Sequence, residues 1–180
     1  MIIKEYAVHG WEEAAQAIGL SYGKSLDKKR ANELAELLVR RGLHSGEANF
    51  LTGVTVNMTI DASIKWWQQA ERYHWFQIVM SESVMHSVAH TPIEKMRFTP
   101  ETPVATIKAF GEVIESYRRG EITQTALIYA VPVGLTEQAR VTTNYLQLLT
   151  MCHQRVNHKL PEWRNFCEQV LRMPHMRVLL

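Results

Sequence analysis

Residues 54–60 read Val-Thr-Val-Asn-Met-Thr-Ile, and this alternation of apolar and polar side chains decides the fold class. Apolar residues fall at every second position, which predicts a β-strand with one buried and one exposed face. The apolar side chains are Val54, Val56, Met58 and Ile60. Strands of this kind are typical of antiparallel sheets. Residues 2–8 form a second short apolar segment, so we expect a small antiparallel sheet.

Most of the remaining sequence predicts helices. Asp27 is a good N-cap for a helix whose leucines recur at helical spacing until Gly42 ends it. Asp61 is likewise expected to cap a long helix over residues 62–80, which is rich in aromatic side chains. Further helices are expected over residues 11–18, from Thr102-Pro103 to Gly120, over residues 135–152 and from Pro161 onward.

The bulk composition indicates one mostly helical α+β domain over residues 1–180. Hydrophobic residues make up 46% of the chain, which is enough for a buried core and argues against disorder. The net charge of +2 gives no sign of the basic stripe of a general nucleic-acid binder. Residues 1–5 carry charge where a secretory signal is apolar, and no apolar run approaches membrane-spanning length. We therefore expect a cytoplasmic protein, in the host cytoplasm if it is viral, without a membrane partner.

The cysteines and histidines do not indicate a metal site. Cys152 and Cys167 belong to no Cys-x-x-Cys pair and have no zinc-ligand spacing with histidine. We expect both to be buried, reduced and free of a disulfide bond. The eight histidines are scattered along the chain, so no metal is expected.

Two polar-rich stretches are the candidate functional regions. Aromatic rings can stack on a nucleobase, amides and hydroxyls can read its edges, and arginine can bind a phosphate through two parallel hydrogen bonds. The alternative is a buried polar network at an interface between subunits. The first stretch contains Glu71, Arg72, Tyr73, His74, Ser81, Glu82, Ser83 and His86. The second contains Gln138, Arg140, Asn144, Gln147, Arg155, Asn157 and His158.

Several motifs resemble the flavin-dependent thymidylate synthases, enzymes that methylate dUMP with a reduced flavin and a folate. Residues 11–22 resemble the family's first helix and its Ala-Arg-x-Ser-Phe end, and residues 37–44 resemble its Leu-x-x-His-Gly-His segment. The spacing from Pro132 to Asn144 resembles that from the family's Leu-Pro to a flavin-contacting asparagine. The spacing from Asn144 to Arg155 resembles that from this asparagine to a phosphate-binding arginine. The resemblance implies the family's fold for this chain.

The resemblance also implies roles for individual residues. Arg155 is expected to bind the nucleotide phosphate; the alternative is that it pairs with an acidic residue such as Glu162 and only holds the last helix in place. Arg72 and His74 are the candidates for catalysis, since arginine stabilises charge and histidine titrates near neutral pH. The implied cofactor contacts are Ser21, His44, Asn49 and Asn144. The other nucleotide-binding candidates are Ser81, Glu82, Ser83, His86 and Arg140.

One departure from the family bears on the cofactor. The Arg-His-Arg signature, which holds the flavin in the family, is absent, and residues 68–74 read Gln-Gln-Ala-Glu-Arg-Tyr-His instead. The resemblance therefore implies FAD, whereas the missing arginines argue against it, because a diphosphate needs positive charge. We expect a homotetramer, since the family builds its sites between subunits.

Two functional hypotheses follow. The first is a nucleotide-binding protein, and if an enzyme then a thymidylate synthase-like transferase, that takes a pyrimidine nucleotide such as dUMP. The second is a non-catalytic binding, assembly or phage regulatory protein that kept the fold and lost the flavin chemistry. The stretch Ser83-Val84-Met85-His86 resembles one found in small phage proteins of the same distant likeness.

Overall fold

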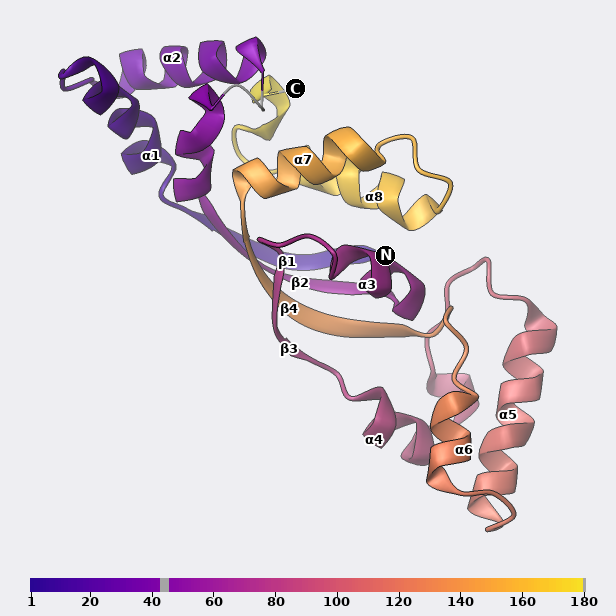
Figure 1. Ribbon diagram of the computed structural model, residues 1–180. Coiled ribbons are helices and arrows are strands. Elements are labelled where there is room, and N and C mark those ends of the chain that lie inside the picture. The colour runs from indigo at the N-terminus through magenta and orange to yellow at the C-terminus, as the bar shows by residue number, and fades with distance from the viewer. Residues whose placement is uncertain (43–45, 180) are drawn as a thin grey trace.

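A four-stranded antiparallel sheet lies at the centre of the computed structural model, which describes residues 1–42 and 46–179 (Figure 1). The strand order is β1 (Ile2–His9), β2 (Thr55–Ser63), β4 (Thr136–Asn144) and β3 (Gln77–Ser81). The two predicted strands are confirmed. The four apolar side chains of residues 54–60 are all fully buried, as the alternation predicts.

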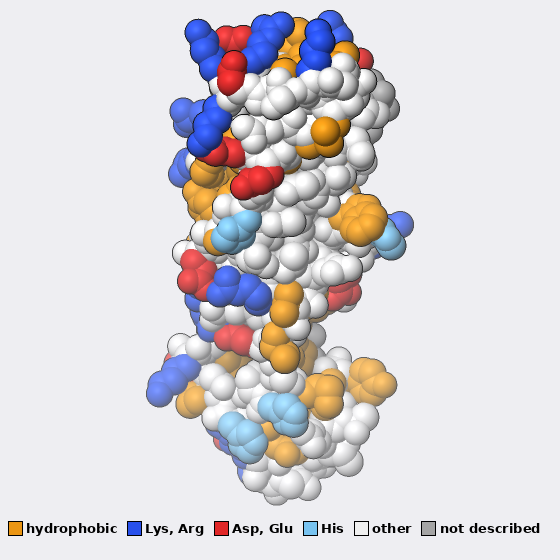
Figure 2. All heavy atoms as spheres, turned by 90° about the vertical axis from the view of Figure 1, so that its left-hand side faces the viewer, with side chains coloured by type: hydrophobic (Ala, Val, Ile, Leu, Met, Phe, Trp, Pro, Cys, Tyr) orange, Lys and Arg blue, Asp and Glu red, His pale blue; other side chains and the backbone are white. Residues whose placement is uncertain are grey.

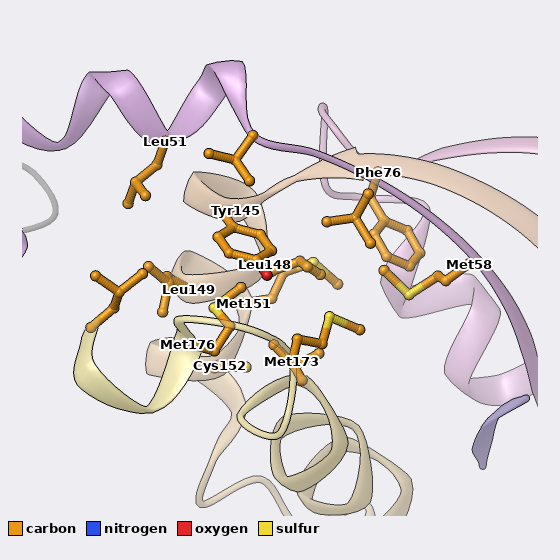
Figure 3. Close-up of a cluster of buried hydrophobic side chains, with 14 of the residues drawn as sticks. Leu51, Met58, Phe76, Tyr145, Leu148, Leu149, Met151, Cys152, Met173 and Met176 are labelled. Carbon is orange, nitrogen blue, oxygen red and sulfur yellow. The ribbon is translucent and has the colours of Figure 1, made fainter. Parts of the chain in front are cut away.

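Helices cover one face of this sheet. In Figure 1, α7 (Tyr145–Arg155) and α8 (Pro161–Val170) lie above it, and α3 (Ile64–Ala70) follows β2 directly. Aromatic side chains from α3 and α8 pack against one another, with the ring centroids of Trp66 and Trp163 4.9 Å apart. Figure 3 shows that the core continues from α7 toward the C-terminal segment, where Tyr145 and Met151 meet Met176.

Two groups of helices extend the molecule at opposite ends of the sheet (Figure 1). At one end are α1 (Trp11–Ala17) and α2 (Lys28–Arg41), with the short 3-10 helices η1 (Ile18–Tyr22) and η2 (Glu47–Gly53). At the other end are α4 (Val84–His90), η3 (Ile93–Lys95), α5 (Val104–Arg118) and α6 (Gln124–Tyr129). The α4–α6 group has a separate hydrophobic cluster. The last 3-10 helix is η4 (Met176–Leu179).

The long helix expected over residues 62–80 is wrong. Strand β2 continues to Ser63, because Ala62 and Ser63 still pair with β4. Ser63, not Asp61, caps α3, with its hydroxyl oxygen accepting a hydrogen bond from the Trp66 amide at 3.1 Å. The helix ends at Ala70, and residues 77–81 form the edge strand β3. A turn between them allows the chain to return along β4.

The helix expected over residues 135–152 is half wrong. Its first part is strand β4, in which Ala139, Val141 and Thr143 are buried at every second position. Only from Tyr145 is the chain helical, and Asn144 caps this helix by accepting from the Gln147 amide at 2.9 Å. The other helix signals are confirmed: the Asp27 cap of α2, the start of α5 after Pro103, and Pro161 in the first turn of α8.

The cysteines are free and buried, which confirms the prediction that they form no disulfide bond. The thiol of Cys167 lies 3.9 Å from the carbonyl oxygen of Cys152. A hydrogen bond with Cys167 and burial raise the pKa of the Cys152 thiol, and burial of both side chains keeps reagents away from either sulfur. We expect iodoacetamide to leave both cysteines unmodified in the native protein and to label both in urea, as measured by intact mass. Rapid labelling without denaturant would contradict this packing.

Within residues 1–42 and 46–179, none of the helices has the length and apolar character that crossing a bilayer requires.

Candidate functional site

Arg155, at the end of α7, is held in a fixed position by aromatic side chains. Its Nε donates a hydrogen bond to the Tyr73 hydroxyl at 2.9 Å. Its guanidinium carbon lies 5.0 Å from the ring centroid of Trp163 and 5.7 Å from that of Tyr73. Trp163 is itself anchored, since its indole N–H donates to Gln69 at 2.8 Å. This arrangement orients the guanidinium without using its two terminal nitrogens.

No carboxylate neutralises Arg155 among the described residues. The alternative pairing with Glu162 is wrong, because the Glu162 carboxylate is buried and accepts from the Ser63 amide at 2.9 Å and the Ser63 hydroxyl at 2.6 Å. Within the described chain, the terminal nitrogens of Arg155 have neither a hydrogen-bond nor an ion-pair partner. They are therefore free to bind an anion.

Other cationic groups surround Arg155 at the turn between α7 and α8. Partial burial and the nearby charges of Arg155, Arg164 and Lys159 lower the pKa of His158. Arg164 donates a hydrogen bond to the carbonyl oxygen of His158 at 2.7 Å and forms no ion pair in the part of the chain described here. We call Arg155, Lys159 and Arg164 the α7–α8 cationic cluster; His158 lies among them, and its lowered pKa favours the neutral ring. The uncompensated positive charge of the cluster suits a phosphate.

The catalytic candidates lie next to this cluster. Arg72 and His74 are exposed in the turn after α3, on either side of the Tyr73 that contacts Arg155. The ring of His74 packs edge-on against exposed Trp75, with centroids 4.8 Å apart. The structure thus brings both residues into the segment that contacts Arg155.

Most of the remaining nucleotide-binding candidates lie together where β3 leads into α4. Glu82, Ser83 and His86 line a pocket of about 410 Å³, and Ser81 is the last residue of β3. We call this cavity the β3–α4 pocket. Figure 2 shows histidine and hydrophobic side chains mixed over the end of the molecule that carries α4, whereas lysines and arginines gather at the α2 end. The lining of the pocket itself includes two acidic residues, Glu82 and Glu137, and two basic ones, Lys95 and Arg97, unlike the α7–α8 cationic cluster.

The Glu82 carboxylate is a structural anchor of this pocket. It accepts from the Arg97 guanidinium at 2.9 Å and from the Gln138 amide at 2.9 Å. Arg97 also pairs with Asp61 at 3.1 Å. Because these contacts occupy Glu82, the side chains of Ser83 and His86 are better placed than Glu82 to contact a ligand.

Sequence reasoning missed Arg97 and Glu137 in this pocket. Glu137 is half-buried on β4, and burial together with the charges of Glu71 and Glu82 raises the pKa of its carboxyl. Within the described chain, the Glu137 carboxyl has no hydrogen-bond or ion-pair partner. A carboxyl with a raised pKa in a cavity wall is a common property of functional sites. Glu137 lies two residues before Ala139 and four before Val141, at the alternating positions of a strand. The helix expected over residues 135–152 obscured this alternation.

Arg140 lies apart from both groups. It is exposed on β4 and forms an ion pair with Glu5 of β1. A hydrogen bond from Thr59, followed by the charge of Arg140, lowers the pKa of Glu5. Arg140 does not line the β3–α4 pocket.

The cofactor candidates are also divided. Ser21 and Asn49 line one pocket of about 550 Å³ between η1 and η2. Asn144 lies elsewhere, because its side chain caps α7. His44 lies outside the described residues.

No protein-family model and no curated protein matches the sequence. Two crystal structures of thymidylate synthase X (ThyX) from Helicobacter pylori, both with FAD and dUMP, are similar along 99% of this chain and 96% of theirs. Their TM-scores are 0.78 and 0.74, at 16% and 15% sequence identity. The chain has the ThyX fold. The fold implied by the sequence motifs is therefore confirmed.

The described lining of the pocket with Ser21 and Asn49 offers little positive charge for the diphosphate of a flavin such as the FAD in those structures. Among its described lining residues, the pocket with Ser21 and Asn49 contains no lysine or arginine. Its one charged lining residue in that set is Glu47, which pairs with Arg41 at 3.9 Å. A diphosphate bound there would meet the Glu47 carboxylate, and the Arg41 guanidinium beside it is already paired with that carboxylate. The described residues also contain no cluster of histidine, cysteine, aspartate and glutamate that could hold a metal ion.

Proposed function

We propose that this protein binds a pyrimidine nucleoside monophosphate such as dUMP, with the phosphate at the α7–α8 cationic cluster. The observation that carries the proposal is Arg155, whose guanidinium is fixed by Tyr73 and Trp163 while its terminal nitrogens stay free. Such a fork can form two parallel, charge-assisted hydrogen bonds with phosphate oxygens. The ThyX fold supports the proposal, since both similar structures contain dUMP.

The base and sugar are assigned to the β3–α4 pocket. Ser83 can donate or accept, and His86 can do either as a neutral ring. The volume of about 410 Å³ lies in the range of small-molecule pockets. The phosphate cluster and this pocket are separate on one chain, so we propose that neighbouring subunits combine them into one site. Ser81 and Arg140 are peripheral in this arrangement.

The expected oligomer is a homotetramer, as the resemblance to the flavin-dependent thymidylate synthases implies, and a site shared between subunits requires at least two chains. Light scattering during size-exclusion chromatography should give about four times the mass of one 20.8 kDa chain. A monomer at micromolar concentration would contradict both the tetramer and the shared site.

A second candidate function is binding without flavin chemistry, as in an assembly or regulatory protein. The observation that favours it is the cation-free lining described around Ser21 and Asn49, which does not suit a diphosphate. If instead a thymidylate synthase-like reaction occurs, Arg72 and His74 are the residues we propose for charge stabilisation and proton transfer. FAD and folate would then be required.

One preparation of purified protein distinguishes nucleotide binding without flavin chemistry from a flavin-dependent reaction. Its absorption spectrum reports bound flavin, and mass spectrometry after denaturation identifies a retained nucleotide. We expect a colourless protein that releases a pyrimidine nucleotide or takes up added dUMP. A flavin absorption band would favour the enzyme, and failure to retain or take up dUMP would contradict the proposed function.

A further inference from the structure

Glu137 is the one carboxyl lining the β3–α4 pocket that has no use within the described structure. Glu82, the other carboxylate of this wall, is fully engaged with Arg97 and Gln138. Glu137 contributes only its backbone, because its carbonyl oxygen accepts from the Trp67 indole at 3.3 Å. A half-buried polar group without a partner costs free energy that a ligand can recover.

We infer that Glu137 reads the edge of the nucleobase as a neutral carboxyl. Its carbonyl oxygen would accept from N3–H of a uracil ring, and its O–H would donate to O4. This inference rests on the proposed function and names the feature of the ligand that the pocket recognises. The β3–α4 pocket would then bind a base that carries a hydrogen-bond donor and an acceptor side by side on one edge.

The protonation state is what makes this pairing chemically suitable. A neutral carboxyl has one donor and one acceptor side by side, whereas a carboxylate has acceptors only and would face O4 with like charge. Burial and the charges of Glu71 and Glu82 favour the neutral form, because they raise the pKa of Glu137. A carboxylic acid kept neutral by its surroundings can donate a hydrogen bond at a pH where a free carboxyl cannot.

Other titratable and charged groups also face this pocket, and the test must separate them from Glu137. The lining residues are Glu82 after β3, His86 on α4, Lys95 on η3 and Arg97 beyond it. The charge of Glu71, which follows α3, also acts on Glu137. The phosphate of dUMP also titrates near neutral pH. These groups are common to the wild-type protein and a Glu137 variant, so the ratio of the two affinities isolates the contribution of Glu137.

The test is calorimetric titration of dUMP into the tetramer between about pH 5 and about pH 8. Glu137→Ala should weaken dUMP binding about 10-fold or more at the lower pH, because two hydrogen bonds are lost. Glu137→Gln should bind like the wild type at low pH, since an amide also offers one donor and one acceptor. The wild-type affinity should fall relative to that of Glu137→Gln as the pH rises through the pKa of Glu137. Glu112→Gln, an exposed substitution on α5, is the matched control and should change nothing.

The outcomes separate this inference from the function on which it rests. If wild-type protein does not bind dUMP at any pH, the proposed function fails. If wild-type protein binds dUMP and Glu137→Ala binds it equally well, the inference is overturned and the function stands. The inference is also overturned if Glu137→Gln is as weak as the alanine variant, or if its affinity falls with pH as steeply as that of the wild type.

Discussion

Replacing Arg155 with alanine is expected to weaken dUMP binding by about 10- to 100-fold or more, because its charge-assisted hydrogen bonding to the phosphate is lost and a single such bond is worth about 1.5–3 kcal/mol. Isothermal titration of both proteins with dUMP measures the change. Arg155→Lys should recover only part of the affinity, since an ammonium cannot reproduce the two parallel bonds of the guanidinium. Arg119→Ala, which removes an exposed arginine paired with Glu121, is the control.

The same substitution should have only a small effect on stability. Alanine removes the stacking of Arg155 on Trp163 and its hydrogen bond to Tyr73, which together are worth about 1–2 kcal/mol. The melting temperature should therefore fall by a few degrees while the fold is kept. If Arg155→Ala binds dUMP as the wild type does, Arg155 has only a structural role and the phosphate site is wrong.

Replacing Glu162 with alanine should destabilise the protein by about 2–4 kcal/mol, because it removes a buried acceptor from two donors. The carboxylate accepts from the amide and hydroxyl of Ser63, and the Met1 ammonium lies 3.8 Å away. Ser63 also caps α3, so the loss weakens the junction between β2 and this helix. Urea denaturation followed by circular dichroism gives the free energy of unfolding.

Two further variants test the cause of this loss. Glu162→Gln keeps an acceptor for Ser63 and should lose less stability than the alanine variant. Glu168→Ala removes an exposed carboxylate from the same helix and should stay within about 0.5 kcal/mol of the wild type. Equal stability of Glu162→Ala and wild type would show that the Ser63 contact does not hold this junction.

The fold could be predicted wherever local signals and tertiary packing agree. Residues 54–60 form a strand because their alternation matches one buried face, and Asp27 caps α2 because its side chain alone supplies the acceptor. Residues 77–81 and 136–144 were assigned to helices because each follows or precedes a true helix without a glycine or proline between them. Their strand structure comes from pairing with each other, which is a long-range interaction that local propensity does not report.

The candidate site was predicted in part for the same reason. Ser83 and His86 line one pocket because they are close in sequence, and Ser21 and Asn49 line another because η1 packs near η2. The partners of Arg155 could not be predicted, since Tyr73 and Trp163 come from segments far apart in the chain. Arg97 and Glu137 were missed because only the sheet brings them beside Glu82.

The most direct test of the nucleotide-binding proposal is a calorimetric titration of the purified protein with dUMP and, in parallel, with deoxyuridine. The two ligands share base and sugar and differ only in the phosphate, which is the group assigned to Arg155. We predict saturable binding of dUMP at one site per chain and binding of deoxyuridine that is weaker by about 10-fold or more. No binding of dUMP up to millimolar concentration, or equal affinity for the two ligands, would contradict the account.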